Sequence, residues 1–485
     1  MNARRPRRGD VLELDVEGVD DRGLSLARFE GEIVRLRGAL PGSRVRAAVR
    51  HRRPGRIEAV LEEVLRPSLA RVEPRCAHFG VCGGCSYQDL AYAAQLEARH
   101  AQLARVLAPL GGPPIAPIRP CAEPWHYRNK MEFTFGTRRW IEAGEPGEVD
   151  ASFALGLHVP GRHDKVLDVR FCHIAFREAS AIVESARSLA QSLGLEAWDL
   201  RTHAGLLRHL VLRKGFTTGE ILVLLVTNET AVDRIDPFAR SILERHPEIT
   251  TFVQQVNAGV AQVGFGAQER VLFGPGSIRD EIADLRFTIS ANTFFQTNTR
   301  QAEHLVELVR ARAGVAPGDL VFDLCCGCGL FSLALAARGA EVVGFELVGS
   351  TVEDARANAL ANGLEGLRFR VGDLVRTLDP AELAHEGIGR PRTCIVDPPR
   401  AGLHPRAVAA LAGLGPERIV YVSCNPRSAL RDLRTLQRRG YRLESAEPVD
   451  LFPHTPHVEC VFALARSASP PGERGQEMAG ESASG

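Results

Sequence analysis

The stretch 320–331 places the strongest constraint on the fold. An apolar segment ends at Asp323, turns through Gly327 and Gly329, and continues into the apolar residues 330–337. This order indicates a strand, a tight turn and a helix. The glycines let the backbone approach a ligand closely, and the start of the helix offers unpaired N–H groups. The sequence therefore predicts the first unit of a nucleotide-binding α/β fold.

A second apolar run, 342–346, ends in Glu346. An acid at the end of the second strand can hold ribose hydroxyls. The turn lacks the third glycine of the dinucleotide fingerprint, which argues against NAD. The layout resembles that of S-adenosylmethionine-dependent methyltransferases, whereas a plain structural turn is the alternative.

Strand and helix patterns alternate regularly beyond this unit, which predicts a largely parallel sheet with right-handed crossovers. Ligands bind such sheets at the carboxyl ends of the strands. Five polar side chains are expected there: Asp323, Glu346, Asp373, Asp397 and Cys424.

The length of 485 residues exceeds one ordinary core, so we expect about two to four domains. A hydrophobic content of 45% with 25% charged residues is typical of globular proteins. The sequence has no apolar run of about 18 residues and no signal-peptide pattern. We therefore expect a cytoplasmic protein, a monomer without membrane contact.

The N-terminal residues 10–65 consist of short apolar runs separated by glycine-containing turns, with arginines at alternate positions. This pattern predicts a small β-barrel with a basic face. It resembles a TRAM domain, an OB-like RNA-binding module. Residues 1–70 hold 15 Arg against 11 acidic residues, and surplus arginine suits phosphate contacts. An ordinary solvated barrel is the alternative.

Three cysteines, Cys76, Cys82 and Cys85, lie close together around two glycines, and Cys172 is a remote fourth candidate. Clustered thiols in a long chain of cytosolic character indicate metal ligation rather than disulfides. One remote ligand and three close ones favour an iron–sulfur cluster over the paired motifs of structural zinc. Zinc and the absence of any metal are the alternatives.

Two further segments have clear patterns. Residues 91–110 repeat apolar side chains at helical spacing, which predicts an amphipathic helix. Residues 127–135 interleave basic and aromatic side chains at the start of a strand. Such a segment can hold phosphates and stack bases, or it can be a half-buried strand with a charged edge.

Asp397 and Cys424 end successive predicted strands, so an acid and a thiol are expected in one crevice. A cysteine at a strand end is most often a packing residue. Here the following Asn-Pro turn should expose Cys424 beside the expected cofactor, which favours a nucleophile.

With these motifs the sequence resembles the RNA uracil-5-methyltransferases that carry a TRAM domain and an iron–sulfur cluster. The resemblance extends to about residue 466. It rests on the cysteine set and on the segments 127–130, 294–298, 323–329, 397–400, 423–426 and 452–459.

The resemblance implies roles for individual residues. Cys424 would be the nucleophile and Glu459 the base. The target uracil would contact Asp397 and Phe294, and a 4Fe-4S cluster would bind Cys76, Cys82, Cys85 and Cys172. S-adenosylmethionine would contact Gln296, Cys325, Glu346 and Asp373. Relatives often have Phe or Tyr at the position of Cys325 and Asn at that of Leu330, so these two contacts depart from the pattern.

The family chemistry explains these residue types. Uracil C5 is a poor nucleophile, so a thiolate first adds to C6, and a base later removes the C5 proton. A paired nucleotide cannot present C6 to a thiol, so the target is flipped out or unpaired. We expect 23S ribosomal RNA as the substrate, with transfer RNA as the alternative.

The implied fold class is α/β. It combines a Rossmann-like class I methyltransferase domain with an N-terminal OB-like barrel and a central α+β domain. The expected boundaries are 1–66 for the barrel, 67–90 with 125–280 for the central domain, 91–124 with 281–465 for the methyltransferase domain, and 466–485 for a disordered tail.

Two rival functions fit parts of the sequence. Asp397-Pro398-Pro399 also occurs in N6-adenine methyltransferases, but there an aromatic residue should follow, and here it is Arg400. A non-catalytic RNA-binding protein with a redox-sensing cluster would require neither Cys424 nor Glu459.

Overall fold

The computed structural model describes residues 5–142, 144–145 and 150–467. The tail 466–485, expected to be disordered, lies outside the described residues except for its first two. Within the described ranges, no helix combines the length and apolar character needed to span a bilayer.

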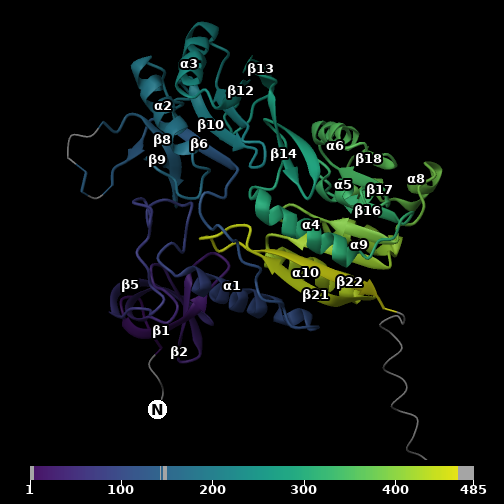
Figure 1. Cartoon of the computed structure of the whole chain (residues 1–485). Helices are drawn as coiled ribbons and strands as arrows, with labels where there is room; N and C mark the ends of the chain where they lie inside the picture. Colours follow the sequence, from purple (N-terminus) through teal and green to yellow (C-terminus); the bar gives the residue numbers. More distant parts are fainter. Residues whose placement is uncertain (1–4, 143, 146–149, 468–485) are drawn as a thin grey trace, which may run out of the picture.

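Five strands close into an N-terminal barrel, drawn in purple in Figure 1, with the order β1-β2-β3-β5-β4. Side chains alternate between buried and exposed along β1, as expected for a strand with one face in a core. The predicted N-terminal barrel is confirmed. Its strands are β1 (Val11–Val19), β2 (Ser25–Phe29), β3 (Glu32–Leu36), β4 (Arg44–Arg53) and β5 (Arg56–Arg66).

The surface of the barrel is less basic than the arginine count indicates. Arg44 and Arg46 both pair with Glu13, and Arg52 pairs with Glu32. Further pairs join Arg28 to Glu17, Arg35 to Asp20, Arg56 to Glu58 and Arg66 to Asp15. Much of the expected basic face is therefore neutralised by acids of the barrel itself.

An eight-stranded central sheet follows, with the order β13-β12-β11-β10-β6-β8-β9-β7. The helices α2 (Ala179–Ser192) and α3 (Val232–Arg245) pack on one face of it. Its strands are β6 (Lys130–Gly136), β7 (Arg139–Trp140), β8 (Ala154–Val159), β9 (Arg162–Asp168), β10 (Leu207–Lys214), β11 (Ile221–Thr227), β12 (Ile249–Val256) and β13 (Gln268–Phe273).

The C-terminal sheet has seven strands in the order β18-β17-β16-β19-β20-β22-β21. The first five are parallel, and β22 runs antiparallel to both of its neighbours, β20 and β21. The strands are β16 (Leu320–Leu324), β17 (Glu341–Glu346), β18 (Leu367–Val371), β19 (Thr393–Val396), β20 (Arg418–Ser423), β21 (Tyr441–Val449) and β22 (Glu459–Arg466). This arrangement confirms the largely parallel sheet expected from the sequence.

Helices cover both faces of the C-terminal sheet, which explains why β16 is almost continuously buried. One face packs against α4 (Thr299–Ala313), α5 (Leu330–Ala336) and α6 (Gly349–Ala361). The other face packs against α1 (Tyr92–Leu107), the 3₁₀ turn Ala108–Leu110, α7 (Leu374–Thr377), α8 (Pro380–His385), α9 (Pro405–Leu414) and α10 (Pro426–Arg438).

The amphipathic helix expected at 91–110 is thus α1, and it lies between the barrel and the C-terminal sheet (Figure 1). The hairpin of β14 (Ser277–Ile282) and β15 (Leu285–Ser290) joins the central and C-terminal sheets. Its side chains share one core with β11 and α4. The three parts of the chain are therefore packed into one body around the carboxyl ends of the parallel strands.

Candidate active site

Cys424 lies at the junction between β20 and α10. Asn425 caps the helix, since its side chain accepts a hydrogen bond from the backbone of Arg427 at 3.1 Å. The Asn425 side chain also donates to the carbonyl of Arg400 at 2.8 Å. Pro426 occupies the first helical turn, where its missing N–H costs nothing. The cap and the proline fix the turn, so the Cys424 thiol is held beside the 397–400 segment.

Asp397 follows β19, and Glu459 is the first residue of β22. Burial raises the pKa of Glu459 well above its usual range, and the Asp397 carboxyl raises it further. Burial, with a contribution from Asp323, raises the pKa of Asp397 to about 7. The structure thus brings together two carboxyl groups whose charges disfavour each other.

Cys424 lies within the field of the same carboxyl groups. Burial raises the pKa of its thiol to about 12, and Glu459 and then Asp397 add to this effect. Arg400 acts in the opposite direction and favours the thiolate. The predicted nucleophile Cys424, the predicted proton acceptor Glu459 and the predicted uracil contact Asp397 therefore lie in one place, although they come from three strand ends.

Gln296, an expected cofactor contact, is linked to Asp397 of this group. Its buried side chain donates to Asp397 Oδ2 at 3.4 Å, and its backbone carbonyl accepts from Asn129 Nδ2 at 2.8 Å. Phe294, two residues earlier, is 62% exposed although Phe295 beside it is buried. An exposed aromatic ring at this position is available for stacking.

The turn after β16 has the conformation that its glycines require. Gly327 and Gly329 both have positive φ, and so does Cys325, at 62°. Glu346 accepts hydrogen bonds from the backbone of Gly327 at 3.2 Å and of Leu347 at 2.7 Å. Its carboxylate therefore links the turn to the end of β17.

Asp373 is exposed and caps the short helix α7, since its Oδ1 accepts from Val375 N at 2.8 Å. Asp323 is fully buried, and its Oδ2 accepts from Ser332 at 2.6 Å while Oδ1 has no partner among the described residues. Burial raises the pKa of Asp323 to about 7. Both acids lie at the carboxyl edge of the sheet, as predicted.

The segment 450–458, which leads into Glu459, is held mainly by α1. Asp450 forms a fully buried ion pair with Arg99, with two bonds of 2.7 Å. Arg99 also donates to the carbonyl of His457 at 3.3 Å. Gln95 accepts from the backbone of His454, a residue with positive φ, and contacts its ring. The helix therefore sets the position of the segment that carries Glu459.

A cavity of about 220 Å³ opens beside Cys424. It is lined from one side by Arg400, Asn425 and His457, and from the other by residues of the barrel and α1, namely Asp21, Arg22 and Gln102. Sequence analysis did not find these three residues, because they lie more than 300 positions before Cys424 and carry no motif. Only the packing of the barrel and α1 against the C-terminal sheet brings them here.

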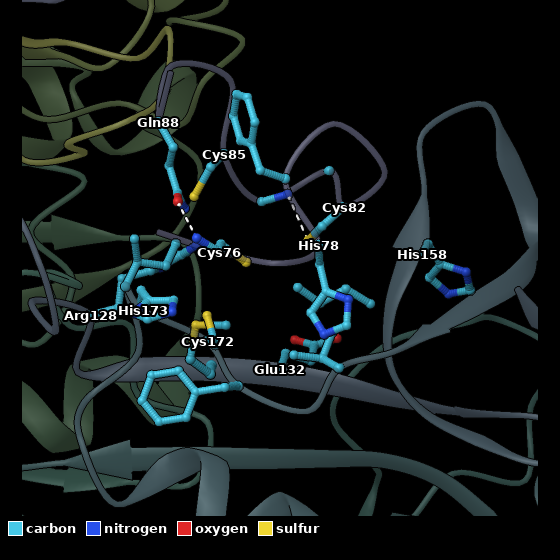
Figure 2. A pocket seen from close by; sticks show the side chains of 18 residues that line it. Cys76, His78, Cys82, Cys85, Gln88, Arg128, Glu132, His158, Cys172 and His173 are labelled. Atoms are coloured by element: carbon cyan, nitrogen blue, oxygen red, sulfur yellow. Dashed lines mark hydrogen bonds between the residues drawn. The ribbon is translucent and has the colours of Figure 1, made fainter. Parts of the chain in front are cut away.

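The four predicted metal ligands line a separate cavity of about 320 Å³. Figure 2 shows Cys76, Cys82, Cys85 and Cys172 around the same space. Burial raises the pKa of Cys82 to about 11 and that of Cys85 to about 12. Cys82 Sγ accepts a hydrogen bond from Gly84 N at 3.4 Å.

His78, which lines the same cavity, is already engaged in other hydrogen bonds. Nδ1 of His78 lies 3.0 Å from the Glu142 carboxylate, and its Nε2 accepts from Arg170 N at 3.2 Å. Among the described residues, no three His, Cys, Asp or Glu side chains converge as ligands of a single ion. Four thiols around one roomy cavity suit a multinuclear cluster better than one zinc ion.

A family model described as tRNA (Uracil-5-)-methyltransferase matches residues 248–467. An RNA methyltransferase of Chlorobaculum tepidum is 38% identical over 96% of this chain and 98% of its own length. One from Porphyromonas gingivalis is 36% identical over 94% of this chain and 100% of its own. The chain belongs to the RNA uracil-5-methyltransferase family.

A solved relative agrees with this assignment. The structure of Pyrococcus abyssi tRNA (uracil-54, C5)-methyltransferase in complex with S-adenosyl-L-homocysteine matches with a TM-score of 0.73 and 28% identity. It covers 94% of this chain and 100% of its own. The enzyme is an S-adenosylmethionine-dependent RNA (uracil-5-)-methyltransferase, and the expected family, fold class and reaction are confirmed.

Proposed function

We propose that the enzyme methylates a uridine of 23S ribosomal RNA through a covalent bond between Cys424 and uracil C6. The observation that supports this proposal is the group of Cys424, Asp397 and Glu459 at neighbouring strand ends, where the two carboxyl groups act on the pKa of the thiol. The same group lies beside Gln296, a candidate cofactor contact.

The thiolate of Cys424 would form the S–C6 bond, and the electron pair of the C5–C6 bond would become available at C5. Bound S-adenosylmethionine supplies an electrophilic methyl group to that carbon. Asp397 would hold the N3–H edge of the base, and the exposed ring of Phe294 would stack against it. Glu459 would then take the C5 proton, and the S–C6 bond would break.

Glu459 is a better candidate for this base than His457. Burial lowers the pKa of His457 to about 4, and nearby arginines, Arg400 first, lower it further. A weakly basic imidazole accepts a proton poorly at neutral pH. The raised pKa of Glu459 makes its carboxylate a stronger base than an ordinary glutamate.

On the cofactor side, we infer that Glu346 and Asp373 contact the nucleoside part of the cofactor and that Cys325 and Gln296 contact the rest. Glu346 already joins the turn at Gly327 to the second strand, which places an acceptor where ribose hydroxyls bind in such sheets.

We also infer that Cys76, Cys82, Cys85 and Cys172 hold a 4Fe-4S cluster. Burial makes the thiols of Cys76, Cys82 and Cys85 costly to ionise, and a cationic iron centre would offset this cost. The N–H donated to Cys82 is of the kind that tunes such clusters.

Transfer RNA is the alternative to ribosomal RNA as the substrate. The preference for ribosomal RNA rests on the four-cysteine site and on the arginines of the N-terminal barrel, seven of which are neutralised by acidic neighbours. The matched structure from Pyrococcus abyssi is named for uracil 54 of transfer RNA, which favours transfer RNA as the second candidate.

Mass-spectrometric mapping of 5-methyluridine in RNA from cells with and without the gene tests the proposal. The modification should disappear from one position of 23S ribosomal RNA and return with the wild-type gene but not with Cys424→Ala. Loss from transfer RNA alone would select the second candidate, and unchanged 5-methyluridine in all RNA would refute both.

A further inference from the structure

The cavity beside Cys424 is lined by one arginine of the barrel, Arg22, at the tip of the β1–β2 hairpin. Its side chain is exposed and makes no ion pair or hydrogen bond among the described residues. Arg400 and Arg427 line the same cavity, and Asp21 is the acid that lines it. Asp21 is paired with Arg427 and also lies within the field of Arg22, so three arginines face a single acid and the lining of the cavity carries a net positive charge.

The hairpin that carries Arg22 is rigidly held. Asp20 accepts hydrogen bonds from the backbone of Arg22 and of Leu24, both at 2.9 Å, and so closes the turn. Arg105 of α1 donates to the carbonyl of Val19 at 2.6 Å. These contacts fix both the shape of the turn and its distance from α1.

The same hairpin is attached directly to the segments around the active site. Asp21 forms an ion pair with two hydrogen bonds to Arg427, three residues after Cys424. Gly23 lies against both segments, since a Cβ added there would be in van der Waals contact, 3.4 Å from Ser86 Oγ and 3.5 Å from Pro456 Cγ. The tip of the hairpin is therefore a fixed wall of the cavity rather than a free loop.

Arg22 also differs from the paired arginines of the barrel. Seven of them are neutralised by acidic neighbours: Arg28, Arg35, Arg44, Arg46, Arg52, Arg56 and Arg66. The turn fixes the backbone that carries the unpaired guanidinium, and the planar fork of donors of an arginine matches a phosphate. The candidate cofactor residues Gln296, Glu346 and Asp373 do not line this cavity, so its anion is not the cofactor.

We propose that Arg22 binds the phosphodiester backbone of the RNA next to the target uridine. The barrel then forms part of the catalytic cavity and sets the position of the substrate at Cys424. This inference rests on the proposed role of Cys424, and it assigns to the barrel a contact within the cavity itself.

The test compares full-length Arg22→Gln with Arg53→Gln. Arg53 is an exposed barrel arginine that makes no ion pair in the described structure and does not line the cavity, so the control removes the same charge. The probe is total RNA from cells that lack the gene. Filter binding at several salt concentrations gives the affinity, and methyl incorporation gives KM and kcat.

Arg22→Gln should raise KM for RNA and weaken RNA binding about tenfold, the loss of one charged hydrogen bond. It should also reduce the slope of the logarithm of RNA affinity against the logarithm of salt concentration by about one. Binding of S-adenosylhomocysteine and the thermal midpoint should not change, and Arg22→Lys should recover part of the affinity. The control should stay within about threefold of wild type.

Equal KM and salt slope in Arg22→Gln and wild type would overturn the inference. So would a fall in kcat alone, because that would mean that Arg22 acts through the Asp21–Arg427 pair. Wild-type enzyme that makes no 5-methyluridine would instead refute the proposed function, whatever the variant binds.

Discussion

Arg99 and Asp450 form a fully buried ion pair, and their two hydrogen bonds of 2.7 Å join helix α1 to the segment before Glu459. Tyr92 donates a third bond to Asp450, also at 2.7 Å. The pair spans 351 positions of the sequence. It therefore couples the N-terminal part of the chain to the position of the proposed base.

Breaking this pair should be costly. Arg99→Leu leaves the Asp450 carboxylate buried without its cation, which typically costs about 3–5 kcal/mol. Calorimetry should show a large fall in the thermal midpoint, and methylation should fall with it. Arg99→Leu/Asp450→Leu should recover part of the stability, because no unpaired charge remains.

The matched control is the exposed pair Arg28–Glu17, whose side chains are more than half exposed. Arg28→Leu should change stability by less than about 1 kcal/mol. Equal effects of Arg99→Leu and Arg28→Leu would contradict the role of the buried pair.

Glu459→Gln tests the assignment of the base. Cys424 should still attack and the methyl group should still transfer, but proton removal from C5 should slow by roughly 10²–10⁴. A covalent protein–RNA adduct should accumulate and survive denaturing gels. Cys424→Ala should form no adduct in any background, and wild-type turnover by Glu459→Gln would assign the proton to another acceptor, with His457 the next to test.

Asp397→Asn should make the protein more stable at pH 8. Burial, with Asp323, raises the folded-state pKa of Asp397 to about 7, above its usual value, so ionisation disfavours the folded state as pH rises through that range. The gain in thermal midpoint over wild type should grow from pH 5 to about pH 7 and then level off.

Asp319→Asn provides the opposite case. A hydrogen bond from Ala316 N, followed by Arg392, lowers the pKa of Asp319, so its charge stabilises the folded state and is lost only in acid. This variant should be less stable than wild type by a constant amount between pH 5 and pH 9. The same pH trend in both variants would refute the raised pKa of Asp397.

Cys172→Ser tests the four-cysteine site. Wild-type protein purified without oxygen should be brown, absorb near ~400 nm and contain iron and sulfide, as thiolate-ligated clusters do. Cys172→Ser should lose most of the iron, whereas Cys121→Ser should keep it, because Cys121 is buried elsewhere and does not line the cavity. Colourless wild-type protein with stoichiometric zinc would exclude the cluster.

The sequence by itself determined the elements whose signals are local. The glycine turn at 327–329, the Asn-Pro turn after Cys424 and the cysteine spacing around Cys82 lie within a few residues of the groups that they position. Backbone preferences and apolar periodicity act over this range. The parallel sheet followed from the regular alternation of strand and helix, and the structure confirms it.

Only the tertiary structure decided which distant groups meet. The pairing of Arg99 with Asp450 and the place of Arg22 beside Cys424 depend on how the barrel and α1 pack against the C-terminal sheet. The pairing of Arg44 and Arg46 with Glu13 depends on how the strands of the barrel close on one another. No local pattern marks such contacts. An ion pair between distant residues forms only where the packing of the fold brings the two charges together, and the residues next to each charge in the sequence do not specify this.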